Sequence, residues 1–429
     1  MRVVIRRFHP VVGGMERQCA ALCARLAAGG MDVEVWTRRI APGAPPVERV
    51  DGYTVRRQRP GGVGRWGEYG GVGALAVRLV ADRRRHDVVA VFGSGWLAVA
   101  AGLACRLTGR PWLLRPATAG DLTRFLDPSA APTGTAAGRI ARRVAPGPDW
   151  RRGVLRGADA VVAVSDEIAA EARGQGFDPG RVVAIANGVD TARIRPAGDA
   201  ARQTARDALG LPGDALVVLF LGRLVARKGV LELVAAWRTL ATASAGGAPA
   251  HRPAVLVIAG TGAGQRDSVA EALAAAVSDG AGGPRGPKAA VGDGAGGPRG
   301  GHPIRLVGAV DDPAAWLAAS DVFVLPSHAE GLSNALLEAM AAGLAIVASD
   351  IPANRAALGS GDDTAWWHPP GDLDALADAI AAASGDATGR DRRGAAARAR
   401  AVARFGLDGA AHRYAALLGA LVERRPYVE

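Results

Sequence analysis

Two glutamates, Glu330 and Glu338, flank the expected start of a helix and could together hold the hydroxyl groups of a ligand. A buried strand is expected at Val322–Leu325, and the next helix should begin near Ser333. Glu330 then stands at the mouth of the connecting loop, and Glu338 lies one to two turns into the helix. A carboxylate so placed can accept from two adjacent hydroxyls, as on a ribose. A capping acid plus a surface acid would explain the same pair without a ligand.

The residues between the two acids add hydrogen-bond donors at the same place. Gly331, Leu332 and Ser333 would present their backbone amides at the N-terminus of the helix. Unpaired N–H groups and the helix dipole favour a phosphate or a sugar oxygen there. The sequence therefore predicts a ligand-binding loop after this strand.

A second loop supplies positive charge. The buried strand expected at Leu216–Leu221 ends at a glycine and is followed by Arg223, Arg227 and Lys228. The end of the first strand in a doubly wound domain is where ligands bind. Arg223 and Lys228 would place two cations against a diphosphate and would stabilise the negative charge of a departing nucleotide. Arg227 could share that role, and solvated surface cations are the alternative.

A third loop, containing Gly13 and Gly14, follows the first expected strand, Arg2–Ile5. The two glycines let the backbone approach an anion closely at the start of the next helix. The pattern is not GxGxxG, and no acid ends the second strand where an NAD ribose would need one. A dehydrogenase is thereby disfavoured.

The elements that must position these loops alternate between short β-rich runs and alanine-rich amphipathic stretches. This pattern is typical of parallel sheets covered by helices, and two such series in one chain predict two doubly wound Rossmann-like α/β domains. The expected strands are Arg2–Ile5, Val33–Thr37, Val88–Phe92, Trp112–Arg115, Ala160–Val164, Val182–Ile185, Leu216–Leu221, Ala254–Ala259, Ile304–Val307, Val322–Leu325 and Ile346–Ala348.

The domain limits follow from this alternation. We expect a first domain at 1–196, a second at 197–405, and a helical segment at 406–429 that packs back toward the first domain. The stretch at about 278–302 contains Asp279–Gly286 and its repeat Asp293–Gly300, both rich in glycine. Such a segment buries too little surface to offset its ordering entropy, so a disordered insertion is expected there.

The charge of the chain indicates which classes of partner it could bind. The formal net charge is +11, and the first 200 residues hold 30 Arg and Lys against 18 Asp and Glu. This favours anionic partners, including a peripheral contact with an anionic membrane for which Arg139–Arg156 is the densest patch. Nucleic acid is disfavoured because no binding motif accompanies the charge. Three cysteines without a CxxC pair and no long apolar run indicate a cytoplasmic protein without a metal site, a disulfide framework or a membrane span.

The chain resembles the retaining glycosyltransferases of family four, which adopt the GT-B fold with a cleft between two Rossmann-like domains. Pro326–Gly343 is similar to the E-x7-E signature of that family, and the downstream Gly343–Asn354 is similar to its next strand and loop. The loop from Gly222 to Gly229 resembles the G-R-x5-K-G pattern, with four residues between Arg223 and Lys228.

The resemblance implies roles for these residues. Glu330 would lie by the donor hexose and Glu338 by the ribose, while Gly13 and Gly14 would face the phosphates. The implied reaction moves a hexose-type sugar from a nucleotide-diphosphate donor to a glycan, a lipid-linked acceptor or a small molecule, with retention. The acceptor hydroxyl would attack on the face from which the diphosphate leaves, and no metal or other cofactor would be required.

Two alternatives remain open. A sugar phosphorylase of the same fold would share nearly all of these residues. An inactive nucleotide-sugar-binding protein is favoured only by one departure from the family. Many members carry a histidine that contacts the donor sugar after the fourth strand, where this chain reads Arg115-Pro-Ala-Thr-Ala-Gly-Asp121. Asp121 or Thr118 would replace it, or His9 would reach in. Asp121 is the strongest candidate for a catalytic role, and the alternative is that it caps a helix beginning at Leu122.

Overall fold

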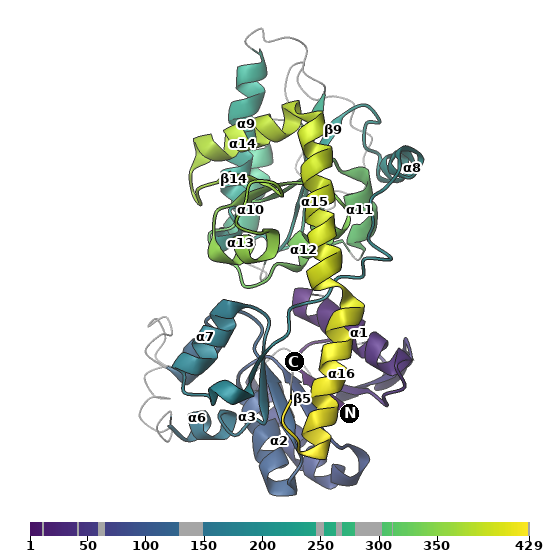
Figure 1. The fold of residues 1–429 in the computed structure, drawn as a ribbon, viewed down its shortest axis with the longest axis vertical. Helices are drawn as coiled ribbons and strands as arrows, with labels where there is room; N and C mark the ends of the chain where they lie inside the picture. Colours follow the sequence, from purple (N-terminus) through teal and green to yellow (C-terminus); the bar gives the residue numbers. More distant parts are fainter. Residues whose placement is uncertain are drawn as a thin grey trace. The chain divides into compact units, whose positions relative to one another are not determined.

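The computed structural model of the chain describes residues 1–10, 13–40, 43–58, 65–127, 149–245, 253–262, 268–278, 303–310 and 312–427. It divides into two compact units, Met1–Gly188 with Leu407–Glu429, and Val189–Gly406. Each unit is a largely parallel sheet flanked by helices (Figure 1). The predicted pair of Rossmann-like α/β domains is confirmed.

The first unit is built on an eight-stranded sheet in the order β3-β4-β2-β1-β5-β6-β7-β8. Its strands are β1 (Arg2–Ile5), β2 (Glu34–Arg38), β3 (Val47–Val50), β4 (Tyr53–Gln58), β5 (Val89–Phe92), β6 (Trp112–Arg115), β7 (Ala160–Ala163) and β8 (Val182–Ala184). Its helices are α1 (Gly14–Ala28), α2 (Arg65–Ala81), α3 (Trp96–Thr108), α4 (Asp121–Leu126), α6 (Asp149–Leu155), α7 (Asp166–Gly174) and α16 (Leu407–Glu423), with 3₁₀ turns η1 (Arg83–Arg85) and η3 (Pro179–Arg181).

Strands β3 and β4 form an antiparallel hairpin that the sequence interpretation lacks. At its turn, Asp51 and Gly52 have φ angles of 45° and 84°. Two successive positive φ angles define a type I′ turn, whose twist matches that of the flanking strands. The Asp-Gly pair between two valine-containing runs is the sequence signal for this hairpin.

The second unit contains a six-stranded parallel sheet in the order β11-β10-β9-β12-β13-β14. Its strands are β9 (Leu216–Leu221), β10 (Ala254–Ala259), β11 (Ile304–Gly308), β12 (Val322–Leu325), β13 (Ala345–Ser349) and β14 (Trp366–His368), the last of which was not predicted. Its helices are α8 (Asp199–Leu209), α9 (Val230–Ala245), α10 (Ser268–Ser278), α11 (Pro313–Ala319), α12 (Asn334–Ala341), α13 (Pro352–Leu358), α14 (Leu373–Gly385) and α15 (Ala387–Phe405), with a 3₁₀ turn η4 (Ala226–Lys228).

The boundary between the units differs from the predicted 196/197. The first unit ends at Gly188, because the following residues bond to α15. The Val189 amide donates to the Phe405 carbonyl at 2.7 Å, and the Arg398 guanidinium donates to the carbonyls of Thr191 and Ile194, both at 3.1 Å. These contacts make the linker part of the second unit.

Helix α16 belongs to the first unit, where it runs beside α1 (Figure 1). Tyr414, Leu417 and Leu418 are buried in the same core cluster as Leu22 of α1. The predicted insertion at about 278–302 lies outside the described residues except for Ser278, which ends α10. Among the described helices, none combines the length and apolar character that crossing a bilayer requires.

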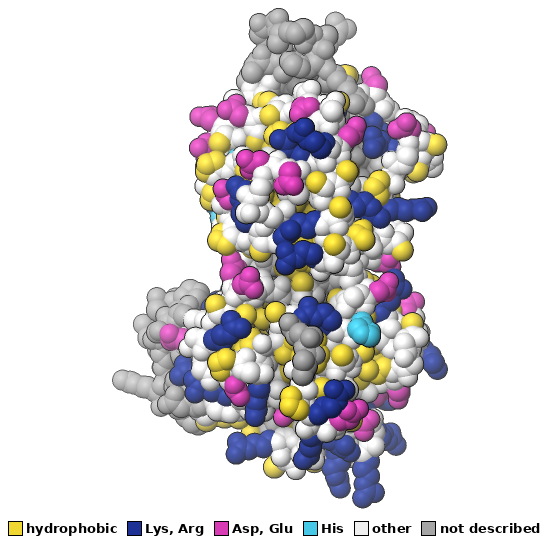
Figure 2. Space-filling model, in the orientation of Figure 1, with side chains coloured by type: hydrophobic (Ala, Val, Ile, Leu, Met, Phe, Trp, Pro, Cys, Tyr) yellow, Lys and Arg dark blue, Asp and Glu magenta, His cyan; other side chains and the backbone are white. Residues whose placement is uncertain are grey.

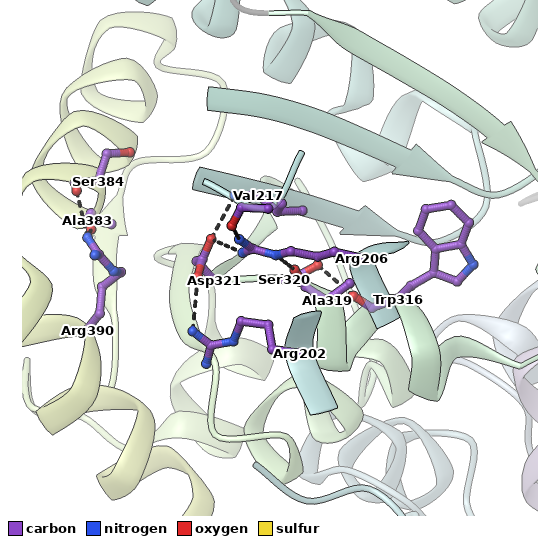
Figure 3. A network of polar contacts seen from close by, with 11 residues as sticks. Arg202, Arg206, Val217, Trp316, Ala319, Ser320, Asp321, Ala383, Ser384 and Arg390 are labelled. Atoms are coloured by element: carbon purple, nitrogen blue, oxygen red, sulfur yellow. Dashed lines mark hydrogen bonds and ion pairs between the residues drawn. The ribbon is translucent and has the colours of Figure 1, made fainter. Parts of the chain in front are cut away.

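A buried network fixes the beginnings of the two central strands of the second unit (Figure 3). The Asp321 carboxylate accepts from the Arg206 guanidinium at 2.7 Å and from the Val217 amide at 2.8 Å. Arg206 also donates to the Ala319 carbonyl at 2.9 Å. Asp321 lies just before β12 and Val217 lies in β9, so α8 ties both strands at the edge opposite their carboxyl ends.

A histidine in the first unit makes its stability dependent on pH. His86 precedes β5, is 3% exposed, and burial is the main cause that lowers its pKa to about 4, with Arg2 and Arg110 adding to the effect. Its pKa is depressed in the folded state, so the stabilisation is complete above about pH 6.5 and is lost as the pH falls toward 4.

As the pH falls from about 6.5 to about 4, we expect the protonation of His86 alone to lower the free energy of unfolding by about 3 kcal/mol. Urea unfolding of wild type and His86→Gln at pH 7, 5.5 and 4.5 measures it. The difference between the two proteins should narrow as the pH falls, and a difference that is constant with pH would contradict the assignment.

Candidate active site

The two strongest sequence motifs follow the two central strands of the second unit. Strands β9 and β12 are neighbours in the sheet, and the chain order reverses between them. Such a reversal point is where open α/β sheets bind ligands, beyond the carboxyl ends of the strands. The loop after β9 carries Arg223 and Lys228, and the loop after β12 carries Glu330.

These two loops are packed backbone against backbone. Gly229 ends the η4 turn with a φ of 65°, and a Cβ built there would lie 2.0 Å from the Pro326 carbonyl oxygen. A Cβ on Gly260, in the turn after β10, would lie 1.7 Å from the Gly222 carbonyl oxygen. A backbone carbonyl cannot rotate away as a side chain can, so only glycine fits at both places. The cationic loop is therefore held from two sides.

The structure brings Lys228 and Glu330 together as a buried ion pair. The Lys228 ammonium donates to Glu330 Oε1, and each residue is 8% exposed. The Ser327 hydroxyl donates to the same oxygen at 2.7 Å. Among the described residues, no hydrogen bond reaches Glu330 Oε2. One carboxylate oxygen thus accepts both bonds that fix the side chain.

Burial dominates the electrostatics of Lys228. Loss of solvent lowers the pKa of its ammonium, and the attraction of Glu330 opposes that shift. Arg227 and Arg223 lower the pKa further through like-charge repulsion. Positive charge in such a dry place interacts strongly with an added anion, because little solvent screens it.

The other cations of the loop lie differently. Arg223 is exposed, and the backbone carbonyl of Arg227 accepts from the His328 amide at 2.9 Å. This backbone bond joins the two loops a second time. Arg223 is therefore the cation of the loop that projects into solvent, and Lys228 is the one held inside.

The predicted amide-bearing segment leads directly into α12. Gly331 and Leu332 precede Ser333, which is the N-cap residue of α12 and makes no side-chain capping bond. Ser333 is 7% exposed. Glu338 is half-buried and lies one turn inside α12, four residues after its first residue, Asn334. This is the placement that the sequence predicts.

A polar layer beneath the loop was missed by the sequence interpretation. The Ser349 hydroxyl, at the end of β13, donates to the Ser327 carbonyl at 2.5 Å. Asn354 Nδ2 in turn donates to the Ser349 carbonyl at 2.9 Å. All three side chains are buried and support Glu330 through Ser327. Small polar residues directly after buried strands are the only sequence signal for such a layer.

The first unit places its glycine loop at the equivalent point of its own sheet. Strands β1 and β5 are neighbours where the chain order reverses, and Gly13 is the N-cap residue of α1, which begins at Gly14. A Cβ on Gly13 would lie 2.4 Å from a carboxylate oxygen of Glu16. Glu16 therefore folds back over the helix start, and an anion binding there must displace a flexible acidic side chain.

Asp121 is occupied by its own loop. Its carboxylate accepts from the amides of Ala117 and Thr118, both at 3.1 Å, from the Thr118 hydroxyl at 2.9 Å and from Arg124 at 3.2 Å. It does not cap α4, which begins at Asp121 itself. Glu171 of α7 accepts from the Gly120 and Thr123 amides instead, each at 2.8 Å. His9 is exposed. These contacts favour a loop-supporting role for Asp121, and the catalytic role predicted from the sequence is not tested by them.

One substitution separates loop support from catalysis at Asp121. The carbonyl oxygen of asparagine can still accept from both loop amides, so we expect Asp121→Asn to keep turnover within about threefold. Steady-state kinetics with circular dichroism as the folding control measures this. A loss of about 100-fold or more with the fold intact would instead assign Asp121 to the transition state.

Comparison with known proteins places this geometry in a family. Residues 13–188 match the family described as "Glycosyl transferase 4-like domain", and residues 215–386 match "Glycosyl transferases group 1". A D-inositol 3-phosphate glycosyltransferase 2 from Catenulispora acidiphila is 29% identical over 373 residues, which cover 84% of this chain and 80% of the relative.

Solved structures share the fold across the whole chain. Sucrose-phosphate synthase from Thermosynechococcus elongatus superposes with a TM-score of 0.73 at 22% identity and 99% coverage of both chains. Anabaena HepE in complex with UDP-glucose gives 0.70 at 18% identity, covering 98% of this chain and 100% of HepE. The chain therefore belongs to the group 1 (family four) glycosyltransferases of the GT-B fold, enzymes that transfer a sugar from a nucleotide sugar.

Proposed function

We propose that this enzyme transfers a hexose from a UDP-hexose to a small phosphorylated polyol or sugar, with retention of the anomeric configuration. The buried Lys228–Glu330 pair at the reversal point of the second sheet is the observation that carries the proposal. The UDP-glucose complex of HepE supports the donor, and the name of the Catenulispora relative supports the acceptor class.

The donor phosphates are the groups that suit the cations. Lys228 has three N–H donors and gives one to Glu330, so it can also donate to a diphosphate oxygen. Arg223, which is exposed, adds a second cation, and the amides of Gly331, Leu332 and Ser333 add neutral donors. Gly13 and Gly14 offer the same chemistry on the first unit. Charge developing on the departing diphosphate is stabilised by these fixed groups.

The two glutamates suit the sugar rings. Glu330 Oε2 accepts from a hexose hydroxyl, and Glu338 accepts from the ribose. In the transfer, the bond from the anomeric carbon to the diphosphate oxygen breaks while a bond to the acceptor oxygen forms on the same face. The acceptor proton passes to the departing phosphate oxygen, so the protein supplies no nucleophile and we propose that no metal is needed.

A donor and acceptor panel tests this function. UDP-, GDP- and ADP-glucose are each incubated with inositol phosphate, glucose 6-phosphate or a lipid-linked sugar, and the product is analysed by NMR for anomeric configuration. We expect UDP release and an α-linked product with a soluble phosphorylated acceptor, unchanged by EDTA. Transfer only to the lipid-linked sugar, an inverted product, or a tenfold loss in EDTA would each overturn the corresponding part of the proposal.

A further inference from the structure

A cavity of about 680 Å³ lies in the first unit, at the edge of the sheet where its strands begin. It is lined by Pro111 and Trp112 at the start of β6, by the end of α3, by α6 and by the residues after α16. The loops of the candidate active site follow the carboxyl ends of strands, whereas this cavity lies before the first residues of β6 and β7. It is therefore separate from the glycine loop at Gly13.

The lining is strongly cationic. Five arginines border the cavity, Arg106, Arg110, Arg181, Arg424 and Arg425, against one acidic residue, Asp159. The Asp159 carboxylate already accepts a hydrogen bond from the Trp112 amide at 2.9 Å, which uses part of its capacity to accept hydrogen bonds. Figure 2 shows Lys and Arg side chains gathered over the end of the first unit where α16 finishes. The lining residues thus carry a net positive charge.

Backbone carbonyls orient several of these arginines. Arg110 donates to the Arg83 carbonyl at 2.9 Å, Arg181 to the Ala158 carbonyl at 3.2 Å, and Arg424 to the Gly109 carbonyl at 3.2 Å. Three of the five arginines are also paired with carboxylates: Arg110 with Asp87 at 3.9 Å, Arg181 with Asp178 at 3.6 Å, and Arg425 with Glu423. Among the described residues, Arg106 and Arg424 have no ion-pair partner.

The shape of the cavity suits a small ligand. Its volume falls within the range of small-molecule sites, about 300–1,000 Å³. The half-buried side chains of Pro111, Val154 and Leu421 supply the apolar part of the lining. A Cβ built on Gly153 in α6 meets no atom within 4 Å, so a larger side chain would have room there. Guanidinium groups without a carboxylate partner, beside an apolar lining, match a phosphate group on a small organic molecule.

We propose that this cavity is a second binding site, distinct from the active site, for a phosphate-bearing ligand. The phosphate sits between Arg106 and Arg424, and the organic part lies against Pro111 and Val154. The phosphate belongs either to a soluble molecule or to a lipid headgroup, and both sources present the same chemistry to the arginines.

Pyrophosphate binding, measured by isothermal titration calorimetry at 0.15 M salt, tests the site. The pocket variant Arg106→Gln/Arg424→Gln removes two lining charges, and Gly153→Trp fills the cavity without changing charge. The control variant Arg392→Gln/Arg404→Gln removes two exposed charges from the second unit. Cosedimentation with phosphatidylglycerol and with phosphatidylcholine vesicles runs in parallel to detect a lipid source.

We expect a pyrophosphate-binding component that weakens at least tenfold in both cavity variants and persists in the control. Sedimentation with phosphatidylglycerol vesicles that is lost in the same two variants, without soluble binding, would assign the phosphate to lipid. Equal behaviour of cavity and control variants in both experiments would overturn the proposal. Melting temperatures of all variants confirm that they fold.

Discussion

Replacing Lys228 with methionine is expected to lower kcat at least 100-fold. A fixed donor that meets charge developing in the transition state contributes about 10²–10³ in rate when it acts in a dry site. The same change leaves the Glu330 carboxylate buried without its cation, which lowers the free energy of unfolding by about 3–5 kcal/mol. Steady-state kinetics and urea unfolding measure the two effects separately.

The double variant Lys228→Met/Glu330→Gln distinguishes catalysis from folding. Neutralising both partners removes the stranded charge, so stability should return to within about 1–2 kcal/mol of wild type while turnover stays low. Arg193→Met is the matched control, because its pair with Asp312 is more than half exposed on both sides and contributes under about 1 kcal/mol. Recovery of turnover in the double variant would show that Lys228 and Glu330 both act only through folding.

The second large effect is expected at Asp321, which lies far from the ligand loops in its own sheet. Asp321→Ala leaves the buried Arg206 without its carboxylate and the Val217 amide without its acceptor. The side chains of Asp321 and Arg206 are 6% and 2% exposed, so the loss should reach about 3–5 kcal/mol. Chemical denaturation followed by tryptophan fluorescence measures this change.

Asp362→Ala is the control for this loss. Asp362 pairs with Arg355 at 3.6 Å, but its side chain is 82% exposed. Its replacement should change the free energy of unfolding by under about 1 kcal/mol, because solvent screens the pair. Equal effects of the two substitutions would contradict the view that burial of the Arg206–Asp321 pair makes it structurally important.

The sequence predicts the central part of the site because its signals are local. Glycine, Lys228 and Glu330 stand at fixed offsets from buried strands, and parallel strands bring their carboxyl ends to one edge of a sheet. The adjacency of β9 and β12 then determines that Lys228 meets Glu330. The sequence analysis expected Lys228 to face a diphosphate and Glu330 to face the donor hexose, and the ion pair between the two residues could not be seen without the fold.

The contacts that support these loops and strands could not be predicted, because each joins residues that lie far apart in the sequence. Glu171 bonds the Gly120 amide from 51 residues away, and Arg206 bonds Asp321 from 115 residues away. Nothing in one sequence distinguishes these residues from the many surface charges of the same type. Among the missed features, the hairpin turn at Asp51–Gly52 is different, because its Asp-Gly pair is a local signal that could have predicted it.

Because α16 lies at the end of the chain, the core of the first unit can be completed only late in synthesis. The second unit is continuous in sequence, whereas the first consists of Met1–Gly188 completed by Leu407–Glu429. Tyr414, Leu417 and Leu418 fill part of the first core, so that core stays open until the chain has passed through the second unit. Domains commonly fold in order of synthesis, N-terminal first. Here a nascent chain can close its second unit while the first still exposes an apolar surface, which makes that interval the one in which the chain most needs protection from aggregation.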